Sequence, residues 1–197
     1  MQLSVFIGGA VIQWLRDELK LINNVAETDQ IARSVDSTNG VYIVPAFIGL
    51  GAPYWDMNSR GTISGITRGT NSSHLVRASL ESIAYQVYDL FTAVQLDMGS
   101  QSTILHVDGG ASQNDFLMQF QADILNIKIN RPENIETTAL GVALLAGLYV
   151  EFWTSPNDFK KIIKINKSFI SSINSKNRSI LLAGWKETIL KTLTRKK

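Results

Sequence analysis

The sequence predicts an α/β domain, because segments typical of buried strands run into glycine turns and then into segments of helical periodicity. The clearest unit begins with the apolar, β-branched segment Thr103–Val107 and turns at Gly109 and Gly110. Beyond that turn, apolar residues recur at three- and four-residue spacing. The amino terminus repeats the pattern, with a strand expected at Leu3–Ile7 and a helix from Val11 to about Ile22. Two such units in one chain favour a sheet flanked by helices.

The composition is that of one folded domain. Hydrophobic residues make up 45% of the 197 residues and charged residues 18%, which is enough apolar surface for a substantial core. The formal charge of +2 is too small to indicate a nucleic-acid surface, and the basic tail Lys191–Lys197 is interpreted as a solvated end. The apolar start Met1–Leu15 lacks a basic leader and is too short to span a bilayer. We therefore expect no nucleic-acid or membrane partner.

Turn-forming residues divide the rest of the first hundred residues into short elements and one long helix. The long helix is expected to begin at residue 72 or 73, with a serine as N-cap, and to end near Met98, where Gly99 stops it. Its apolar stripe indicates packing on a sheet, whereas Glu81 and Asp89 lie off the stripe and are interpreted as solvated charges. The short elements are a helix at Glu27–Val35, a strand at Val41–Pro45, a loop at Gly49–Asp56 and a strand at Gly61–Ile66.

The second half alternates helices and strands beyond the central turn. A helix should reach about Asn126, and the next strand must end at Arg131-Pro132, because proline has no N–H for a neighbouring strand. Helix Thr137–Phe152 contains glycines, which cost up to about 1 kcal/mol each, so it should approach a ligand or another backbone closely. The other elements are a strand at Ile127–Asn130, a short helix opened by Ser155-Pro156, an edge strand at Ile162–Phe169, and a closing helix at Asn174–Thr194 with Ile180, Trp185 and Ile189 facing inward.

Several segments together resemble one protein family. The run Gly61-Thr-Ile-Ser-Gly-Ile66, followed after seven residues by His74-Leu-Val-Arg-Ala-Ser-Leu-Glu81, is similar to the carboxy-terminal signature of the FGGY family of carbohydrate kinases. Val107-Asp-Gly-Gly110 and Thr138-Ala-Leu-Gly-Val-Ala143 follow in that family's order and spacing. Pentulose kinases typically have Gly-Glu-Arg where this chain has Gly51-Ala52-Pro53, so the likeness is to the family's glycerol kinases. The segments that carry this narrower likeness are Gly9–Asp17, Gly49–Asp56 and Phe116–Asp123.

The resemblance implies a ribonuclease-H-like domain of the actin and hexokinase type, a mixed sheet with flanking helices. Family members have two such domains, with ATP and the polyol meeting in the cleft between them. Residues 1–197 would form the second, nucleotide-binding domain of an ATP-dependent glycerol kinase, incomplete at its amino end. Its partner would be the missing amino-terminal domain, and the missing opening hairpin would leave a sheet edge that favours homo-oligomers. The resemblance also implies a cytoplasmic enzyme.

The resemblance further implies which residues bind ATP or ADP with Mg²⁺. A helix that starts after a glycine turn offers unpaired N–H groups to a ligand. A side chain at Gly110 would meet the nucleotide or force a positive φ. No catalytic residue is expected in this chain, because the base and the acceptor pocket would lie in the missing part. The residues assigned to the nucleotide are Gly9, Gln13, Gly110 and Asn114, with Asp108 and Gly109 as supporting residues.

Three other functions are alternatives to this one. The first alternative is a kinase for another polyol or sugar. The acceptor pocket that would distinguish the two lies outside these residues, so only the family likeness favours glycerol. A truncated, non-catalytic nucleotide-binding or interaction domain is the second alternative. A dinucleotide-binding oxidoreductase is disfavoured, since neither glycine pair has the G-x-G-x-x-G spacing. The chain has no cysteine, and His74 and His106 lack the spacing of metal ligands, so no metal site made by the protein is expected.

Overall fold

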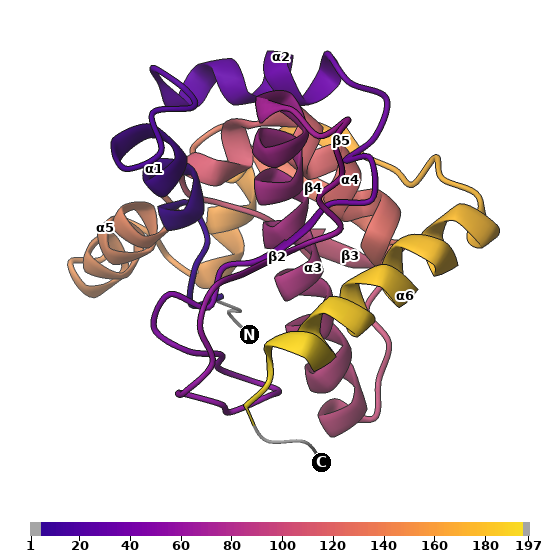
Figure 1. The fold of residues 1–197 in the computed structure, drawn as a ribbon. Coiled ribbons are helices and arrows are strands. Elements are labelled where there is room, and N and C mark those ends of the chain that lie inside the picture. The colour runs from indigo at the N-terminus through magenta and orange to yellow at the C-terminus, as the bar shows by residue number, and fades with distance from the viewer. Residues whose placement is uncertain (1–4, 195–197) are drawn as a thin grey trace.

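A computed structural model describes residues 5–194, without the side chains of residues 160 and 161, as helices packed around two small sheets (Figure 1). The helices are α1 Ala10–Asp17, η1 Val25–Glu27, α2 Thr28–Arg33, α3 Ser72–Met98, η2 Gly110–Gln113, α4 Asp115–Leu125, α5 Thr137–Tyr149, η3 Pro156–Lys161 and α6 Ser175–Thr192, where η marks a 3₁₀ helix. The strands are β1 Tyr42–Val44, β2 Thr62–Ser64, β3 Ile104–His106, β4 Lys128–Pro132 and β5 Ile165–Phe169.

Helix α3 runs through the centre of the fold and is closed by a cap at each end (Figure 1). The Asn71 side chain accepts a hydrogen bond from the backbone N–H of His74 at 3.2 Å, and His74 Nδ1 accepts one from the Asn71 N–H at 3.1 Å. At the other end Gly99 adopts a left-handed conformation with φ 61°. The predicted helix is confirmed. The predicted serine N-cap is wrong: the N-cap is Asn71, because its side chain and that of His74 each accept a hydrogen bond from the other residue's backbone N–H.

The strands form one antiparallel pair and one mixed sheet. β1 and β2 pair antiparallel, and β1 lies between α3 and α6. In the second sheet β4 is central, parallel to β3 and antiparallel to β5, which confirms the predicted mixed α/β fold. Pro132 is the last residue of β4, as expected for a residue without an N–H. Within the described residues, the outer edge of β3 has no partner strand.

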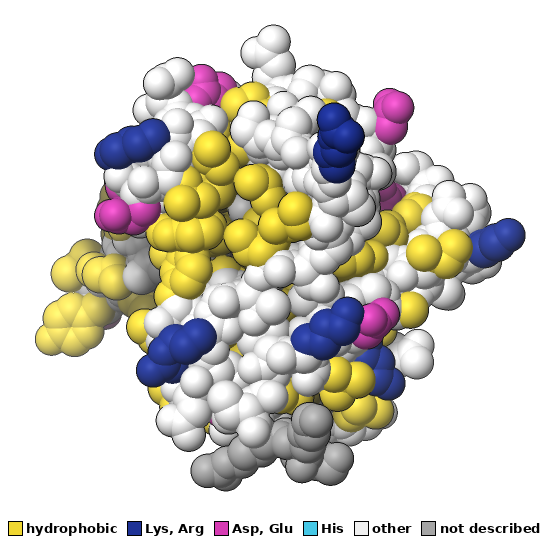
Figure 2. Space-filling model, in the orientation of Figure 1, with side chains coloured by type: hydrophobic (Ala, Val, Ile, Leu, Met, Phe, Trp, Pro, Cys, Tyr) yellow, Lys and Arg dark blue, Asp and Glu magenta, His cyan; other side chains and the backbone are white. Residues whose placement is uncertain are grey.

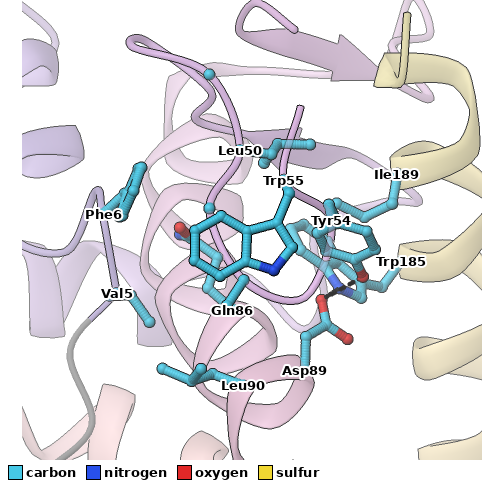
Figure 3. A pocket seen from close by; sticks show the side chains of 13 residues that line it. Val5, Phe6, Leu50, Tyr54, Trp55, Gln86, Asp89, Leu90, Trp185 and Ile189 are labelled. Carbon is cyan, nitrogen blue, oxygen red and sulfur yellow. Dashed lines mark hydrogen bonds between the residues drawn. The ribbon is translucent and has the colours of Figure 1, made fainter. Parts of the chain in front are cut away.

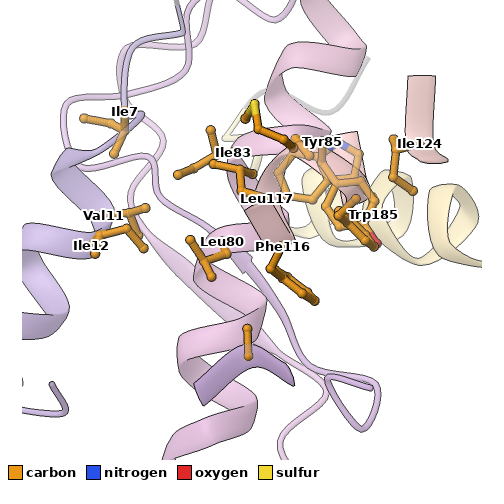
Figure 4. Packing of buried hydrophobic residues seen from close by; sticks show 14 of the residues in the cluster. Ile7, Val11, Ile12, Leu80, Ile83, Tyr85, Phe116, Leu117, Ile124 and Trp185 are labelled. Carbon is orange, nitrogen blue, oxygen red and sulfur yellow. The ribbon is translucent and has the colours of Figure 1, made fainter. Parts of the chain in front are cut away.

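Aromatic rings join α3 to α4 and α6 in the core (Figure 4). Tyr85 of α3 stacks on Trp185 of α6, with ring centroids 5.0 Å apart and planes 12° apart. Tyr85 also meets Phe120 of α4 edge-on at 5.4 Å. Both arrangements suit the charge distribution of aromatic rings and contribute about 0.5–1.5 kcal/mol beyond burial. These contacts hold α4, which begins at the central turn, against the rest of the domain.

Three expectations about element bounds and faces are wrong. Residues 5–7 form no strand, because no strand of the described part pairs with them, and residues 3 and 4 lie outside the described residues. Helix α1 ends at Asp17 instead of Ile22, and Lys20 has φ 55°, which a right-handed helix does not accommodate. Ile180 is 58% exposed, because the buried stripe of α6 follows Trp185 and Ile189 at helical spacing and Ile180 lies off it.

Helix α5 stands apart from the other helices (Figure 1). Gly147 does have a close neighbour, but it is a side chain and not the predicted backbone or ligand: a Cβ on Gly147 would lie 2.6 Å from Trp153 Nε1. At Gly141 the described residues leave open space within 4 Å, so no other backbone lies close there and the approach of a ligand stays a prediction. Most of α5 is exposed, and Leu144 is its buried residue.

Two acidic residues of α3, Glu81 and Asp89, are not the solvated charges that were expected: Glu81 is buried and Asp89 is half-buried. Glu81 is 3% exposed and pairs with Arg77 at 2.9 Å. Asp89 accepts hydrogen bonds from the Tyr54 hydroxyl and from Trp185 Nε1, both at 2.7 Å. The Asp89 carboxyl group therefore ties the loop that carries Tyr54 and the helix α6 to α3. The spacing of apolar residues gives no sign of these contacts, since charges off an apolar stripe are usually exposed.

We predict that Asp89 makes the stability of the chain depend on pH. Burial raises the pKa of Asp89 from 3.8 to about 6, although the hydrogen bonds from Trp185 and Tyr54 oppose the rise. The folded protein then binds the proton more tightly than the unfolded chain does. This stabilisation is complete below about pH 4 and is lost as the pH rises through about 6, by an amount on the order of 3 kcal/mol.

The comparison is Asp89→Asn, because an amide oxygen accepts the same two hydrogen bonds without titrating. The free energy of unfolding, measured by urea titration between about pH 4 and pH 7, should fall more steeply in the unsubstituted chain. Burial raises the pKa of Glu81 to about 7. Glu81 therefore lowers the free energy of unfolding with rising pH in both proteins alike. Parallel curves for the two proteins would contradict the role given to Asp89.

Candidate functional site

The central turn follows β3 and redirects the chain at Gly109. Gly109 has φ 76° and ψ 173°, a combination available essentially to glycine alone. Its N–H donates to the carbonyl of Ile135 at 3.0 Å, which anchors the turn to the segment before α5. Gly110 has no positive φ and begins the short helix η2. The prediction that a side chain would force a positive φ at Gly110 is therefore wrong, because the unusual conformation lies one residue earlier.

Side chains from neighbouring elements hold this turn in place. Ser112 Oγ donates to the Gly109 carbonyl at 2.7 Å, and Arg131 Nη1 donates to the Ser112 carbonyl at 2.9 Å. Thr137, the first residue of α5, donates a hydrogen bond to the Asp108 carboxylate. The turn is thus linked to β4 through Arg131 and to α5 through Asp108.

Side chains accept hydrogen bonds from two N–H groups in the first turn of α4. Asn114 Oδ1 accepts a hydrogen bond from the Leu117 N–H at 2.9 Å, and Asp29 Oδ2 accepts one from the Phe116 N–H at 2.6 Å. Because both of these donors are occupied, the start of α4 offers a ligand fewer free N–H groups than the sequence predicted. Sequence reasoning missed Asp29, which lies 87 residues before Phe116 and carries no local signal of the contact.

The open N–H groups lie in the two glycine turns instead. Those of Gly110 and Ala111 have no acceptor among the described residues, and both residues are exposed. At the start of α1, the N–H groups of Gly9 and Ala10 likewise have no acceptor in the described part of the chain. A Cβ built on Gly9 or Gly110 would meet nothing within 4 Å. Each turn therefore presents two adjacent donors beside open space.

The two turns belong to different parts of the fold. Gln13 is exposed on α1 close to Gly9, whereas Asn114 is partly exposed at the start of α4. No hydrogen bond or ion pair between described residues joins the two groups, but η1 contacts α1 and α2 contacts α4. The structure thus leaves Gly9 and Gln13 as one group and gathers the other candidate residues in a second, namely Asp108, Gly109, Gly110 and Asn114.

One hollow on the described surface borders the central turn. It has a volume of about 230 Å³ and is lined by Gln113, Arg131, Pro132, Glu133, Ile135 and Asn166. Another, of about 220 Å³, lies beside Trp55, with Phe6, Leu90 and Asp89 around it (Figure 3). None of the candidate residues lines either hollow, but the first one adjoins the central turn through Gln113 of η2 and Ile135, whose carbonyl accepts from the Gly109 N–H.

Two further properties of the described residues limit the chemistry of the site. They include no group of three or more acidic, cysteine or histidine side chains that could hold a metal ion. None of their helices has the length and the apolar character needed to cross a membrane. The donors found at the two glycine turns are backbone N–H groups, which can bind ligands that carry hydrogen-bond acceptors.

The mixed sheet, the flanking helices and the two open glycine turns define an α/β domain suited to polar or anionic ligands. Residues 1–149 match the family model described as the FGGY family of carbohydrate kinases, C-terminal domain. The chain belongs to this family, as its motifs indicated.

The similar curated proteins are kinases of the same family. A glycerol kinase of Shewanella woodyi is 54% identical over 190 residues, which cover 96% of this chain and 38% of that protein. A glycerol kinase of Clostridium botulinum is 51% identical over 190 residues, with the same coverage. The chain thus spans 38% of the length of these relatives.

Solved structures of kinases share the fold. Plasmodium falciparum glycerol kinase, crystallised with ADP, is 37% identical and superposes with a TM-score of 0.85 over 96% of this chain and 37% of its own. A xylulose kinase of Lactobacillus acidophilus has a TM-score of 0.77 over 94% of this chain and 37% of its own, at 23% identity. The second likeness concerns the fold alone.

We predict that Gly109 and Gly110 respond differently to alanine. Gly109→Ala puts a Cβ on a backbone with φ 76°, which should cost about 1–3 kcal/mol of unfolding free energy. Gly110→Ala meets open space on an ordinary backbone and should change stability by less than about 0.5 kcal/mol. Chemical denaturation of both variants measures the difference. Equal losses would be incompatible with the turn as described.

Proposed function

We propose that this chain is the nucleotide-holding, carboxy-terminal domain of an ATP-dependent glycerol kinase, which converts ATP and glycerol to ADP and glycerol 3-phosphate. The observation that carries the proposal is the 54% identity to a glycerol kinase over 96% of the chain. The ADP present in the Plasmodium falciparum kinase supports the nucleotide, and the open N–H groups of the two turns supply donors for it. We place the whole enzyme in the cytoplasm, as the family resemblance implies.

The role of this domain would be to grip the nucleotide. Phosphoryl transfer needs a base near the accepting hydroxyl, a metal ion across the phosphates and a rigidly held nucleotide. In this proposal Gly9, Gln13, Gly110 and Asn114 contact ATP or ADP, and Asp108 and Gly109 order the central turn. Mg²⁺ would be carried by the nucleotide phosphates, because the described residues offer no cluster to hold it. The base and the glycerol pocket would come from the rest of the longer kinase.

Experiments can distinguish two alternatives to this function. Another polyol or sugar would replace glycerol if the amino-terminal part belonged to a different branch of the family, and a gluconate kinase of Lactobacillus acidophilus shares the fold at 23% identity. The higher identity to glycerol kinases favours glycerol. A non-catalytic nucleotide-binding or interaction domain would bind ADP and never support turnover.

We propose that residues 1–197 form one domain whose partner is the amino-terminal part of such a kinase. Two exposed features support this partner. Val142, Leu145 and Tyr149 of α5 are 65%, 64% and 88% exposed, and Figure 2 shows apolar side chains over α5 at the left of that face. The outer edge of β3 is open within the described residues. An apolar face and an open edge of this kind favour association, with the partner domain or between copies as a homo-oligomer.

ADP should bind weakly, with a Kd of about 1 mM, which corresponds to roughly −4 kcal/mol. In an NMR titration, the backbone amide signals of Gly9, Gly110 and Ala111 should shift first, because these N–H groups are open. Gly110→Ala should bind ADP more weakly at unchanged stability, since its methyl group would occupy the open space. If those signals stayed still at saturating ADP while another region moved, the residue assignment would be wrong.

The chain alone should show no glycerol-dependent ADP formation. Removing a general base alone costs about 10²–10⁴ in rate, and losing the positioning of the acceptor costs more. A coupled assay with glycerol and Mg-ATP should detect turnover when the amino-terminal part of the Shewanella woodyi glycerol kinase is added as a separate chain. Turnover by the chain alone would show that it contains an acceptor site and a base, and would contradict the proposal.

A matched variant tests whether α5 carries the association. Leu145→Glu adds a charge to the exposed face of α5 and should lower both the restored activity and any self-association seen by sedimentation velocity. Lys186→Glu places the same charge on an exposed position of α6 and serves as the control. Equal effects of the two variants would show that the association does not depend on the exposed face of α5.

A further inference from the structure

Thr28, the first residue of α2, is fully buried, and its hydroxyl group makes two hydrogen bonds. Thr28 Oγ1 donates to the Val25 carbonyl at 2.7 Å. Asn114 Nδ2 donates to Thr28 Oγ1 at 3.0 Å. Because a hydroxyl group has one hydrogen, and Val25 receives it, the Thr28 oxygen can meet Asn114 only as an acceptor.

The two ends of the Asn114 amide are therefore specified by different partners. Its Oδ1 accepts from the Leu117 N–H at 2.9 Å, and a backbone N–H can only donate. Thr28 requires the NH₂ end of the same amide. The second hydrogen of Nδ2 has no acceptor among the described residues, and Asn114 is partly exposed. That hydrogen is available to a ligand beside the central turn.

The next residue of α2 holds the same helix start. Asp29 Oδ2 accepts from the Phe116 N–H at 2.6 Å, and Asp29 Oδ1 accepts from Arg33 Nε at 2.7 Å. Burial opposes ionisation of Asp29, but Arg33 and the Phe116 N–H outweigh it and lower the pKa of this carboxyl group. Helix α2 thus contacts the first turn of α4 at residues 114 and 116, so Asn114 sits on a fixed backbone.

We propose that Thr28 is a positioning residue of the nucleotide site, which orients the Asn114 amide so that it offers a hydrogen-bond donor to the nucleotide. The inference rests on the proposed function. An acceptor atom of the nucleotide, such as a ring nitrogen or a ribose oxygen, would face Asn114 Nδ2. Without the Thr28 hydroxyl, the NH₂ end loses its fixed partner, and the donor is no longer aimed at the ligand.

The test compares ADP binding by NMR titration in the full chain and four variants. Thr28→Val keeps the shape of the side chain without the hydroxyl group and should weaken ADP binding about 3- to 10-fold, the effect of one neutral hydrogen bond. Its Asn114 side-chain NH₂ signals should also shift in the absence of ADP. Thr28→Ser keeps the hydroxyl group and should restore both properties.

Thr188→Val is the matched control for lost stability. Thr188 is 2% exposed, and its hydroxyl donates to the Gly184 carbonyl within α6 at 2.9 Å. This variant should lose a similar amount of stability and keep the ADP affinity of the unsubstituted chain. Thr28→Ala removes the same hydroxyl group as Thr28→Val and must give the same loss of affinity, so the test does not depend on the folding of one variant.

The outcomes separate this inference from the proposed function. If ADP leaves Gly110 and every other amide unmoved in the unsubstituted chain, the proposed function fails, and the inference fails with it. If ADP binds the unsubstituted chain and binds Thr28→Val equally well, only the positioning role is overturned. Equal weakening by Thr28→Val and Thr188→Val would assign the loss to stability and would overturn the positioning role as well.

Discussion

The candidate site depends on the backbone conformation of Gly109. A φ of 76° lets the chain leave β3 and enter η2, after which α4 packs on α3 and β4. The same turn presents the N–H groups of Gly110 and Ala111 at the surface, and the bond from the Gly109 N–H to Ile135 fixes the approach to α5. A Cβ at this position would be strained whatever the surroundings. The open donors, the direction of α4 and the start of α5 therefore all follow from one glycine.

Local patterns predicted those parts of the fold that local interactions determine. Helix α3 has the predicted span because its period and its stop at Gly99 lie within the helix, and β4 ends at Pro132 for an equally local reason. The errors concern partners distant in the sequence. Residues 5–7 have a strand-like composition but no neighbouring strand in the described part. Asp89 is off the apolar stripe of α3, and only the fold brings two donors to it. The sequence motifs predicted the glycine turns, but they gave no sign of the hydrogen bonds from α2 to the start of α4.

Helix α5 supports the proposal that another surface packs on this domain. Its sequence is apolar on nearly all sides, which suits a helix covered on more than one face. The described residues bury Leu144 and leave larger side chains such as Tyr149 exposed. Single exposed apolar residues are ordinary, but a whole exposed apolar helix is not. The start of α5 is nevertheless tied to the central turn through Thr137 and Asp108, so a surface that covers α5 would also restrain the candidate site.

Helix capping and ligand binding compete for the same N–H groups in this domain, and capping takes those of α4. Asn114 and Asp29 occupy its first turn, so α4 is ordered before any ligand arrives, and less binding energy is needed to order it. What remains for a nucleotide is the pair of open donors in each glycine turn and one hydrogen of the Asn114 amide. At about 1 kcal/mol net for each bond, and against the cost of association, so few contacts support at best roughly millimolar binding. Tighter binding requires further contacts with the phosphates, and on this argument they must come from outside the described turns.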